Sequence, residues 1–177
     1  IIDGPHSGNA TPMVSSTIPT AFTIHPELER RAFDYDAARA LLDEAGWVAE
    51  GDPLVDGGDG LRVCRGCAFA EEGTEFVFDL LNPGSSGRED VAVIIQDQLA
   101  QIGIQANAQV LDFNTLYADN MGVQTYDAAV AGWRGGLPFD PNQNSFFGAE
   151  NDIFGSETYG FNFTSYYNER LEEIWDT

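Results

Sequence analysis

The chain has 177 residues, of which 29 are acidic and 8 are basic, so its formal net charge is −21. This negative charge does not fit nucleic-acid binding, which depends on basic side chains at phosphates, or attraction to an anionic membrane surface. A hydrophobic fraction of 43% is too high for a disordered chain and is enough for a packed core. No apolar run approaches the roughly 20 residues that span a bilayer.

The first 34 residues read as an extended segment that packs on the rest of the chain. Prolines interrupt this segment every seven residues, at Pro5, Pro12, Pro19 and Pro26. No helical or alternating apolar pattern survives between them. The chain begins with Ile1 rather than Met, and its last predicted helix stops abruptly at Thr177. We therefore expect the natural chain to continue at both ends.

The first regular element is a helix over residues 36–46. Asp36 is the expected N-cap, apolar residues follow at helical spacing, and Gly46 is a natural stop. Residues 48–74 are rich in Gly and Asp, which predicts a loop or the tip of a hairpin.

Alternating strands and helices follow, and together they predict an α/β fold. In chain order they are a strand at 75–81, a helix from Ser85 or Ser86 to Ile102 ended by Gly103, a strand at 104–110, a short helix capped by Asp112, a strand at 127–133, and a last helix capped by Asn168. This order favours a mixed sheet with covering helices, and places one α/β domain at residues 35–177.

Cys64 and Cys67 form a C-x₂-C pair in the Gly-rich stretch. Zinc would need two further ligands, and the other soft candidates are His6 and His25 in the irregular N-terminal segment. We expect a local disulfide, which would imply an oxidising compartment. Free structural thiols, or metal or redox chemistry, remain alternatives. No metal site and no cofactor is predicted.

The most distinctive candidate site follows the strand at 127–133. Trp133 offers a flat stacking face, Arg134 offers paired donors for a carboxylate, and Gly135 and Gly136 let backbone approach a ligand closely. Ligand sites of open α/β sheets lie just beyond strand ends. The alternative is a core tryptophan beside a surface arginine. Asn162 lies in a second aromatic and Asn-rich segment that could face the same cleft, or form an ordinary aromatic loop.

Five segments resemble motifs of one known family, in the same order. Residues 35–47 resemble the Y-D-x-x-x-A-x-x-L-L-x-E-A-G-[WY] helix of the family 5 extracellular solute-binding proteins, the dipeptide/oligopeptide-type receptors of ABC importers. The other four are a strand at 76–81, an I-Q-x-x-L-x-x-I-G-I passage at 95–104 preceded by Arg88, a Y-D…G-W…D-P series at 126–141, and an N-x-x-x-Y-x-N motif at 162–168.

This resemblance implies most of one lobe of a two-lobed, periplasmic-binding-protein-like (class II) fold that traps its ligand by hinge closure. It further implies a non-catalytic, monomeric, extracytoplasmic protein in the periplasm or at the cell surface, lipid-anchored in its full-length form, that delivers a peptide, sugar or other solute to ABC permease subunits. Peptide-binding members carry Asp three residues after the Trp, where this chain has Gly136. Recognition of a free peptide amine therefore does not follow.

Two other functions are compatible with the sequence. A hydrolase would need two carboxylates converging in a pocket, one with a raised pKa, and the many adjacent acids of this chain do not single out such a pair. A sensor that presents its ligand to a membrane receptor would have the same sequence features as an import receptor.

Overall fold

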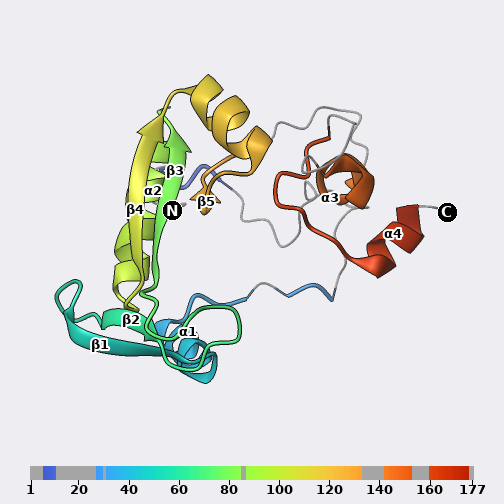
Figure 1. The fold of residues 1–177 in the computed structure, drawn as a ribbon. Coiled ribbons are helices and arrows are strands. Elements are labelled where there is room, and N and C mark those ends of the chain that lie inside the picture. The colour runs from blue at the N-terminus through green and yellow to red at the C-terminus, as the bar shows by residue number, and fades with distance from the viewer. Residues whose placement is uncertain are drawn as a thin grey trace. The chain divides into compact units, whose positions relative to one another are not determined.

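The computed structural model describes residues 6–10, 27–29, 31–84, 87–132, 142–152 and 160–175 (Figure 1). The chain divides into two compact units. Unit 1 consists of Ile1–Asn9, Arg31–Leu111 and Asp127–Ala131, and unit 2 of Ala10–Arg30, Asp112–Tyr126 and Gly132–Thr177. No helix in the described ranges is both long and apolar enough to cross a membrane.

Unit 1 is built on a three-stranded parallel sheet with the strand order β4-β3-β5. The strands are β3 (Val77–Pro83), β4 (Gln105–Leu111) and β5 (Ala128–Ala129). β3 pairs with β4 along its whole length and with β5 at Leu80 and Leu81. The predicted α/β class is confirmed. The antiparallel strands of the fold form a separate two-stranded sheet. The described part of the three-stranded sheet is therefore parallel throughout rather than mixed.

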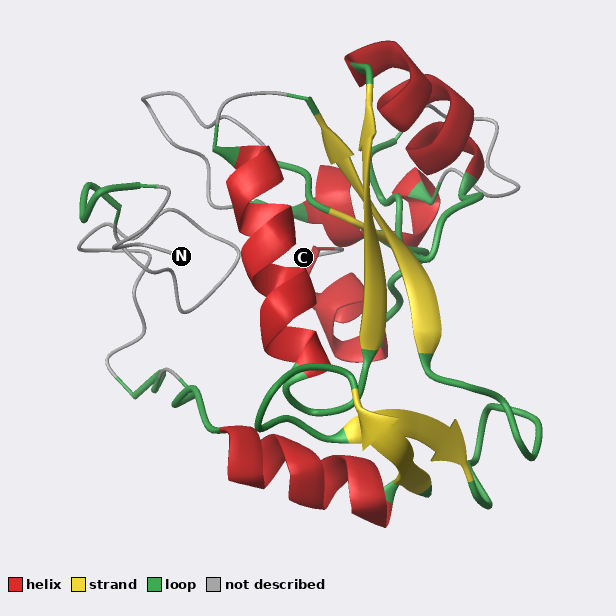
Figure 2. Cartoon of the chain, turned by 90° about the vertical axis from the view of Figure 1, so that its left-hand side faces the viewer, coloured by secondary structure: helices red, strands yellow, loops and turns green. Residues whose placement is uncertain are grey.

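Helix α2 (Arg88–Ala100) lies along one face of this sheet (Figure 2). The core between them centres on Leu80, Ala92 and Ala106, with Ile95 and Leu99 packed against it. Ala92 is fully buried at the centre of this contact. A small side chain at this position lets the helix approach the sheet closely.

The stretch expected to be a loop or hairpin tip forms the antiparallel hairpin of β1 (Trp47–Pro53) and β2 (Gly60–Cys64). Arg62 is 1% exposed in the middle of β2, and its Nε donates to the carbonyl oxygen of Ile102. The rings of Trp47 and Phe76 pack with their centroids 4.4 Å apart. The hairpin is thus joined to the turn that follows α2.

Helix α1 (Tyr35–Glu44) begins one residue earlier than predicted, and the expected cap at Asp36 is wrong. Asp34 is the N-cap: its backbone is extended, and its carboxylate accepts from the N–H groups of Asp36 and Ala37. The predicted stop is confirmed, because Gly46 has a φ of +86°.

The start of α2 also differs from expectation. The N-cap is Gly87 in a left-handed conformation, without a side-chain cap, while Ser85 and Ser86 lie outside the described residues. Gly103, with a φ of +79°, follows the helix as predicted.

Unit 2 contains short elements connected by loops. They are a π-helical turn at Thr115–Asn120, 3₁₀ turns at Met121–Val123 and Ala149–Asn151, α3 (Asn144–Phe147) and α4 (Glu169–Trp175). The two predicted caps here are confirmed. Asp112 accepts from the N–H groups of Asn114 and Thr115, and Asn168 accepts from that of Leu171.

Candidate functional site at the carboxyl edge of the sheet

The strand that leads to the predicted ligand site is present, but the site itself lies outside the described residues. β5 covers only Ala128–Ala129 of the strand expected at 127–133. Val130 extends the pairing, because its N–H donates to the carbonyl oxygen of Leu81 at 2.8 Å. The described chain then runs to Gly132. The predicted ligand-binding residues Trp133, Arg134, Gly135 and Gly136 all follow this point.

The carboxyl ends of the three strands meet at one edge of unit 1, because the strands are parallel. Pro83 pairs with Leu111 at the ends of β3 and β4, and Gly84 donates to the carbonyl oxygen of Leu111 at 3.1 Å. Val130 continues β5 beside them. Open α/β sheets bind their ligands outside this edge. It is therefore the candidate functional site of unit 1.

Asn82 is the buried polar residue of this edge, and no sequence pattern pointed to it. The residue is 1% exposed, and its Nδ2 donates to the carbonyl oxygen of Gln109 at 3.0 Å. Its Oδ1 has no hydrogen-bond partner in the described part of the chain. A buried acceptor without a donor costs about 1–3 kcal/mol, so a fold does not ordinarily keep one.

The surroundings of Gly84 add one charged group to this edge. A Cβ atom at Gly84 would lie 3.0 Å from Cγ1 of Val110 and 3.5 Å from Oε1 of Glu89. The carboxylate of Glu89, in the first turn of α2, therefore lies beside the end of β3. Acceptor oxygens are thus available at this edge.

Asn162 is fully buried in unit 2, where it organises its own loop. Its Nδ2 donates to the carbonyl oxygens of Gly148 and Tyr166, and its Oδ1 accepts from the N–H of Tyr166 and the hydroxyl of Thr164. All four hydrogen-bonding positions of the amide are therefore used within unit 2. A role in ligand binding would have to act through the loop that Asn162 holds.

A polar cluster beside this loop was not apparent from the sequence. Gln124 Nε2 donates to the hydroxyl of Ser165 at 2.9 Å, and that hydroxyl lies 3.0 Å from Oδ1 of Asp152. Gln124 and Ser165 have φ values of +53° and +49°, which are uncommon for residues other than glycine. The cluster fixes the backbone next to Asn162.

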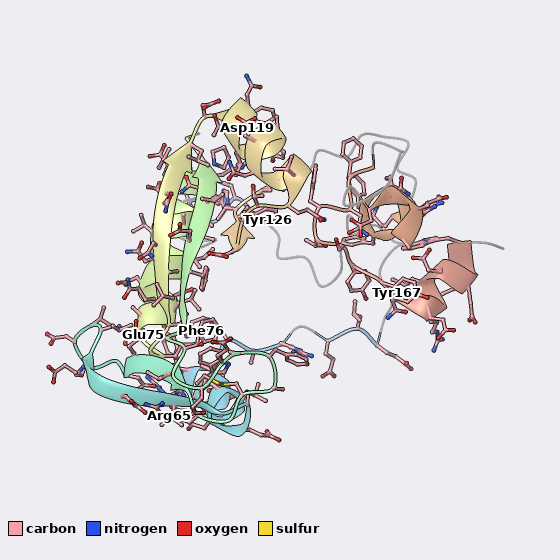
Figure 3. All side chains as sticks on the ribbon, viewed as in Figure 1. Arg65, Glu75, Phe76, Asp119, Tyr126 and Tyr167 are labelled. Carbon is pink, nitrogen blue, oxygen red and sulfur yellow. A yellow bond between two sulfur atoms is a disulfide. The ribbon has the colours of Figure 1, made fainter. Side chains whose placement is uncertain are left out.

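The aromatic residues of the same loop pack mainly on one another. Phe161 stacks on Phe146 at 5.8 Å between centroids, and it also contacts Phe163 at 6.2 Å. The hydroxyl of Tyr126 donates to the carbonyl oxygen of Phe163, and burial raises the pKa of Tyr126. Tyr167 is 64% exposed on the segment that leads into α4 (Figure 3).

The structure joins Cys64 and Cys67 in a disulfide at the end of the hairpin. Arg65, labelled in Figure 3, donates from Nε to Glu50 at 2.7 Å and from Nη1 to Glu72 at 3.3 Å. The described residues contain no group of three or more His, Cys, Asp or Glu side chains placed to hold a metal ion.

Glu50 and Asp112 are two carboxyl groups whose surroundings favour the charged form. A hydrogen bond from Arg65 lowers the pKa of Glu50, and hydrogen bonds from Thr115 lower that of Asp112. A general acid needs a shift in the opposite direction.

Comparison with protein families gives one family for most of the chain. Residues 1–154 match the family model described as "Bacterial extracellular solute-binding proteins, family 5 Middle". The oligopeptide-binding protein AppA of Bacillus subtilis (strain 168) is 29% identical over 163 residues, which cover 88% of this chain and 26% of AppA.

Solved structures agree with the fold. The structure of Bacillus subtilis AppA in complex with a nonapeptide gives a TM-score of 0.72 at 24% identity, over 99% of this chain and 32% of AppA. An oligopeptide-binding protein from Thermus thermophilus, complexed with a pentapeptide, gives 0.72 at 18% identity, over 98% and 29%. The chain thus spans about a third or less of these relatives, and the likeness corresponds to one lobe of a two-lobed fold.

Proposed function

This chain belongs to the bacterial extracellular solute-binding proteins of family 5, and from that membership we propose that the full-length protein captures a peptide outside the cytoplasm for an ABC importer. In this proposal residues 35–177 form most of one lobe, and residues 1–34 pack on it. The ligand is enclosed between two lobes, and the closed protein delivers it unchanged to permease subunits. The observation that carries the proposal is the family match over residues 1–154.

The name and the solved structure of a relative support a peptide as the ligand. AppA carries the name of an oligopeptide-binding protein, and the solved AppA structure holds a nonapeptide. Gly136 stands where peptide-binding members carry an aspartate for the peptide amine. We therefore expect backbone contacts along an extended peptide to contribute more than its free amino terminus.

The proposed binding residues follow β5 at the carboxyl edge of the sheet. Trp133 stacks on a flat group of the ligand, Arg134 pairs with a carboxylate or carbonyl, and Gly135 and Gly136 offer backbone N–H groups. Asn162 contributes indirectly, since its amide is fully used in holding its own loop.

The test is a binding titration on the full-length protein, purified without refolding and first examined for retained cargo by native mass spectrometry. Synthetic peptides of four to nine residues and mannohexaose serve as probes. Trp133→Ala should weaken peptide binding at least tenfold, while Phe69→Ala, which changes a fully exposed ring, should leave it unchanged. Equal titrations for Trp133→Ala and the wild type would remove Trp133 from the site.

Further measurements address the rest of the proposal. The bound peptide should be recovered intact after prolonged incubation, because no catalytic step is proposed. Light scattering should give the mass of a monomer, and labelling with a fatty acid should reveal a lipid anchor on the full-length protein. Loss of peptide uptake in a strain that lacks the gene would favour import over presentation to a sensor.

A further inference from the structure

Phe69 presents its aromatic ring to solvent in the loop that joins β2 to β3. The ring is fully exposed, and it is the most exposed of the large apolar side chains in the described ranges. Its neighbours in sequence, Ala68 and Ala70, have small side chains. Because the transfer of an aromatic ring out of water is favourable, a partner that encloses Phe69 gains binding free energy.

The disulfide and two backbone hydrogen bonds close the base of this loop. The disulfide joins Cys64 to Cys67. The N–H of Cys64 donates to the carbonyl oxygen of Thr74 at 2.8 Å, and the N–H of Gly73 donates to the carbonyl oxygen of Cys64 at 3.0 Å. Both ends of the loop are therefore held at Cys64. A contact that is held in place before binding loses less conformational entropy when the complex forms.

Arg65 and Gly66 attach the loop to its surroundings in unit 1. The N–H of Arg65 donates to the carbonyl oxygen of Gly46 at 2.7 Å, just after α1. The guanidinium of Arg65 donates to both carboxylate oxygens of Glu50 in β1, at 2.7 and 2.9 Å. The N–H of Gly66 donates to Oε2 of Glu72 at 2.9 Å. The loop is thus fixed on two sides, while the ring of Phe69 remains in solvent.

The charged residues that accompany the ring are mainly acidic. Glu71, Glu72 and Glu75 follow Phe69 within six residues. The arginine of the loop, Arg65, bonds to Glu50 and Glu72, so its charge is already balanced. A complementary partner surface therefore carries lysine or arginine around the pocket for the ring. An anionic lipid surface has the wrong sign of charge for this contact.

The loop lies at the opposite end of the strands from the candidate ligand edge. Phe76, which follows the loop, donates from its N–H to the carbonyl oxygen of Arg62, and its own carbonyl oxygen accepts from the N–H of Gln105 at the start of β4. Arg65, Glu75 and Phe76 lie together at this amino end of the strands (Figure 3). Contacts through Phe69 and contacts at the carboxyl edge therefore use separate surfaces of unit 1.

We propose that the loop at residues 64–74 is a docking site for a second protein, which receives the ring of Phe69 in an apolar pocket bordered by lysine or arginine side chains. Aromatic side chains are enriched among the residues that dominate protein–protein binding. The surrounding glutamates add attraction that weakens as the salt concentration rises. The inference goes beyond the proposed function, because it concerns a protein partner at a surface away from the ligand edge.

The first measurement establishes whether the ring is exposed in the full-length protein. Fluorine NMR of the protein with para-fluorophenylalanine at position 69 compares its resonance in H₂O and D₂O. The solvent-induced change should equal that of the free amino acid. A resonance shielded from solvent would show that another part of the same protein covers the ring, and would overturn the inference.

The second measurement identifies the partner and then tests the contact directly. The full-length protein carries the photoreactive p-benzoylphenylalanine at position 69 in the cells that produce it, and the same group at position 41 is the control, because Leu41 is also an exposed apolar side chain of unit 1. The protein cross-linked from position 69 is then purified and titrated. Phe69→Ala should weaken its binding at least tenfold, and Leu41→Ala should leave it within twofold of the wild type. Glu71→Lys and added salt should each weaken it as well.

The outcomes are distinguishable from those of the ligand titration. The inference is overturned if no protein is cross-linked from position 69, if position 41 gives the same adduct, or if Phe69→Ala binds the partner as tightly as the wild type. Adducts with lipid alone would assign the ring to a membrane and would also overturn it. Peptide binding should be equal in Phe69→Ala and the wild type. A wild type that binds no peptide would contradict the proposed function and leave the docking site standing.

Discussion

Arg62 and Ile102 are 40 residues apart in the sequence, and Nε of Arg62 donates to the carbonyl oxygen of Ile102 at 2.7 Å. The same guanidinium donates to the carbonyl oxygen of Trp47 and to the carboxylates of Asp43 and Asp59. One buried cation therefore connects α1, the hairpin and the turn after α2.

Replacing Arg62 by Met should destabilise the protein by about 3 kcal/mol, because Asp59 and two backbone carbonyls lose a partner that is shielded from water. Arg65→Met is the matched control. It removes an arginine from the same hairpin, but one whose side chain is 42% exposed, so its effect should be much smaller. Urea unfolding of the full-length variants gives both values. Equal midpoints for the two variants would contradict the stabilising role of Arg62 between α1, the hairpin and the turn after α2.

Gly103→Ala should cost about 3 kcal/mol or more. A Cβ atom there would overlap the carbonyl oxygen of Gly60, and the backbone has a φ of +79°. Gly57→Ala introduces the same atom at a φ of +75°, with no atom within 4 Å. It should cost only about 1 kcal/mol for the left-handed backbone. Thermal unfolding of the two variants separates steric conflict from backbone strain.

Removing the disulfide by replacing both Cys64 and Cys67 with Ala should lower stability by about 2 kcal/mol, the loop-closure contribution for so short a loop. The wild type should show the same loss when a reductant is added, and the double variant should not respond to reductant at all. Differential scanning calorimetry with and without dithiothreitol measures both. If the melting temperature of the wild type is the same with and without the reductant, the disulfide does not contribute to the stability of the protein.

The cap at Asp112 should make the free energy of unfolding depend on pH in the acidic range. The hydroxyl and backbone N–H of Thr115, with the N–H of Asn114, hold the pKa of Asp112 below its ordinary value. The stabilisation is therefore fully present above the unfolded-state pKa, roughly pH 4, and is lost as the pH falls through the lower folded-state pKa.

Asp112→Asn keeps an acceptor but does not titrate, so its unfolding midpoint should vary less than that of the wild type between roughly pH 2 and pH 5. Thr115→Val removes the hydroxyl and should shift the loss to a higher pH. Circular dichroism during urea unfolding at each pH records the curves. Parallel curves for the wild type and Asp112→Asn would show that the cap does not titrate with folding.

Local signals predicted much of unit 1. Gly46 and Gly103 end their helices because only glycine adopts the left-handed backbone at little cost. The sequence predicts the strand at 75–81, but its side chains do not alternate between buried and exposed after Phe78, since residues 80–83 are all buried. A central strand of a parallel sheet is covered along both edges and faces, and alternation alone does not show this.

The features that sequence patterns missed depend on contacts between distant residues. Arg62 stands in a Gly- and Asp-rich stretch that reads as a surface loop, and only the turn after α2 explains its burial. Asp34 and Asp36 are equally good caps by composition, and the extended backbone at residue 34 decides between them. The orphaned oxygen of Asn82 depends on Gln109, which is 27 residues away. The predicted site at 133–136 remains a prediction.

The family motif at residues 95–104 contains Gln96, whose side chain bonds to the backbone of β4. Oε1 of Gln96 accepts from the N–H of Ala108 at 3.0 Å. In the described part of the chain, β4 is the last strand of its sheet, and this contact occupies the position that a neighbouring strand would take. Unprotected edges of this kind recruit strands from other molecules. A single amide on α2 therefore occupies one of the backbone donors along the outer edge of β4.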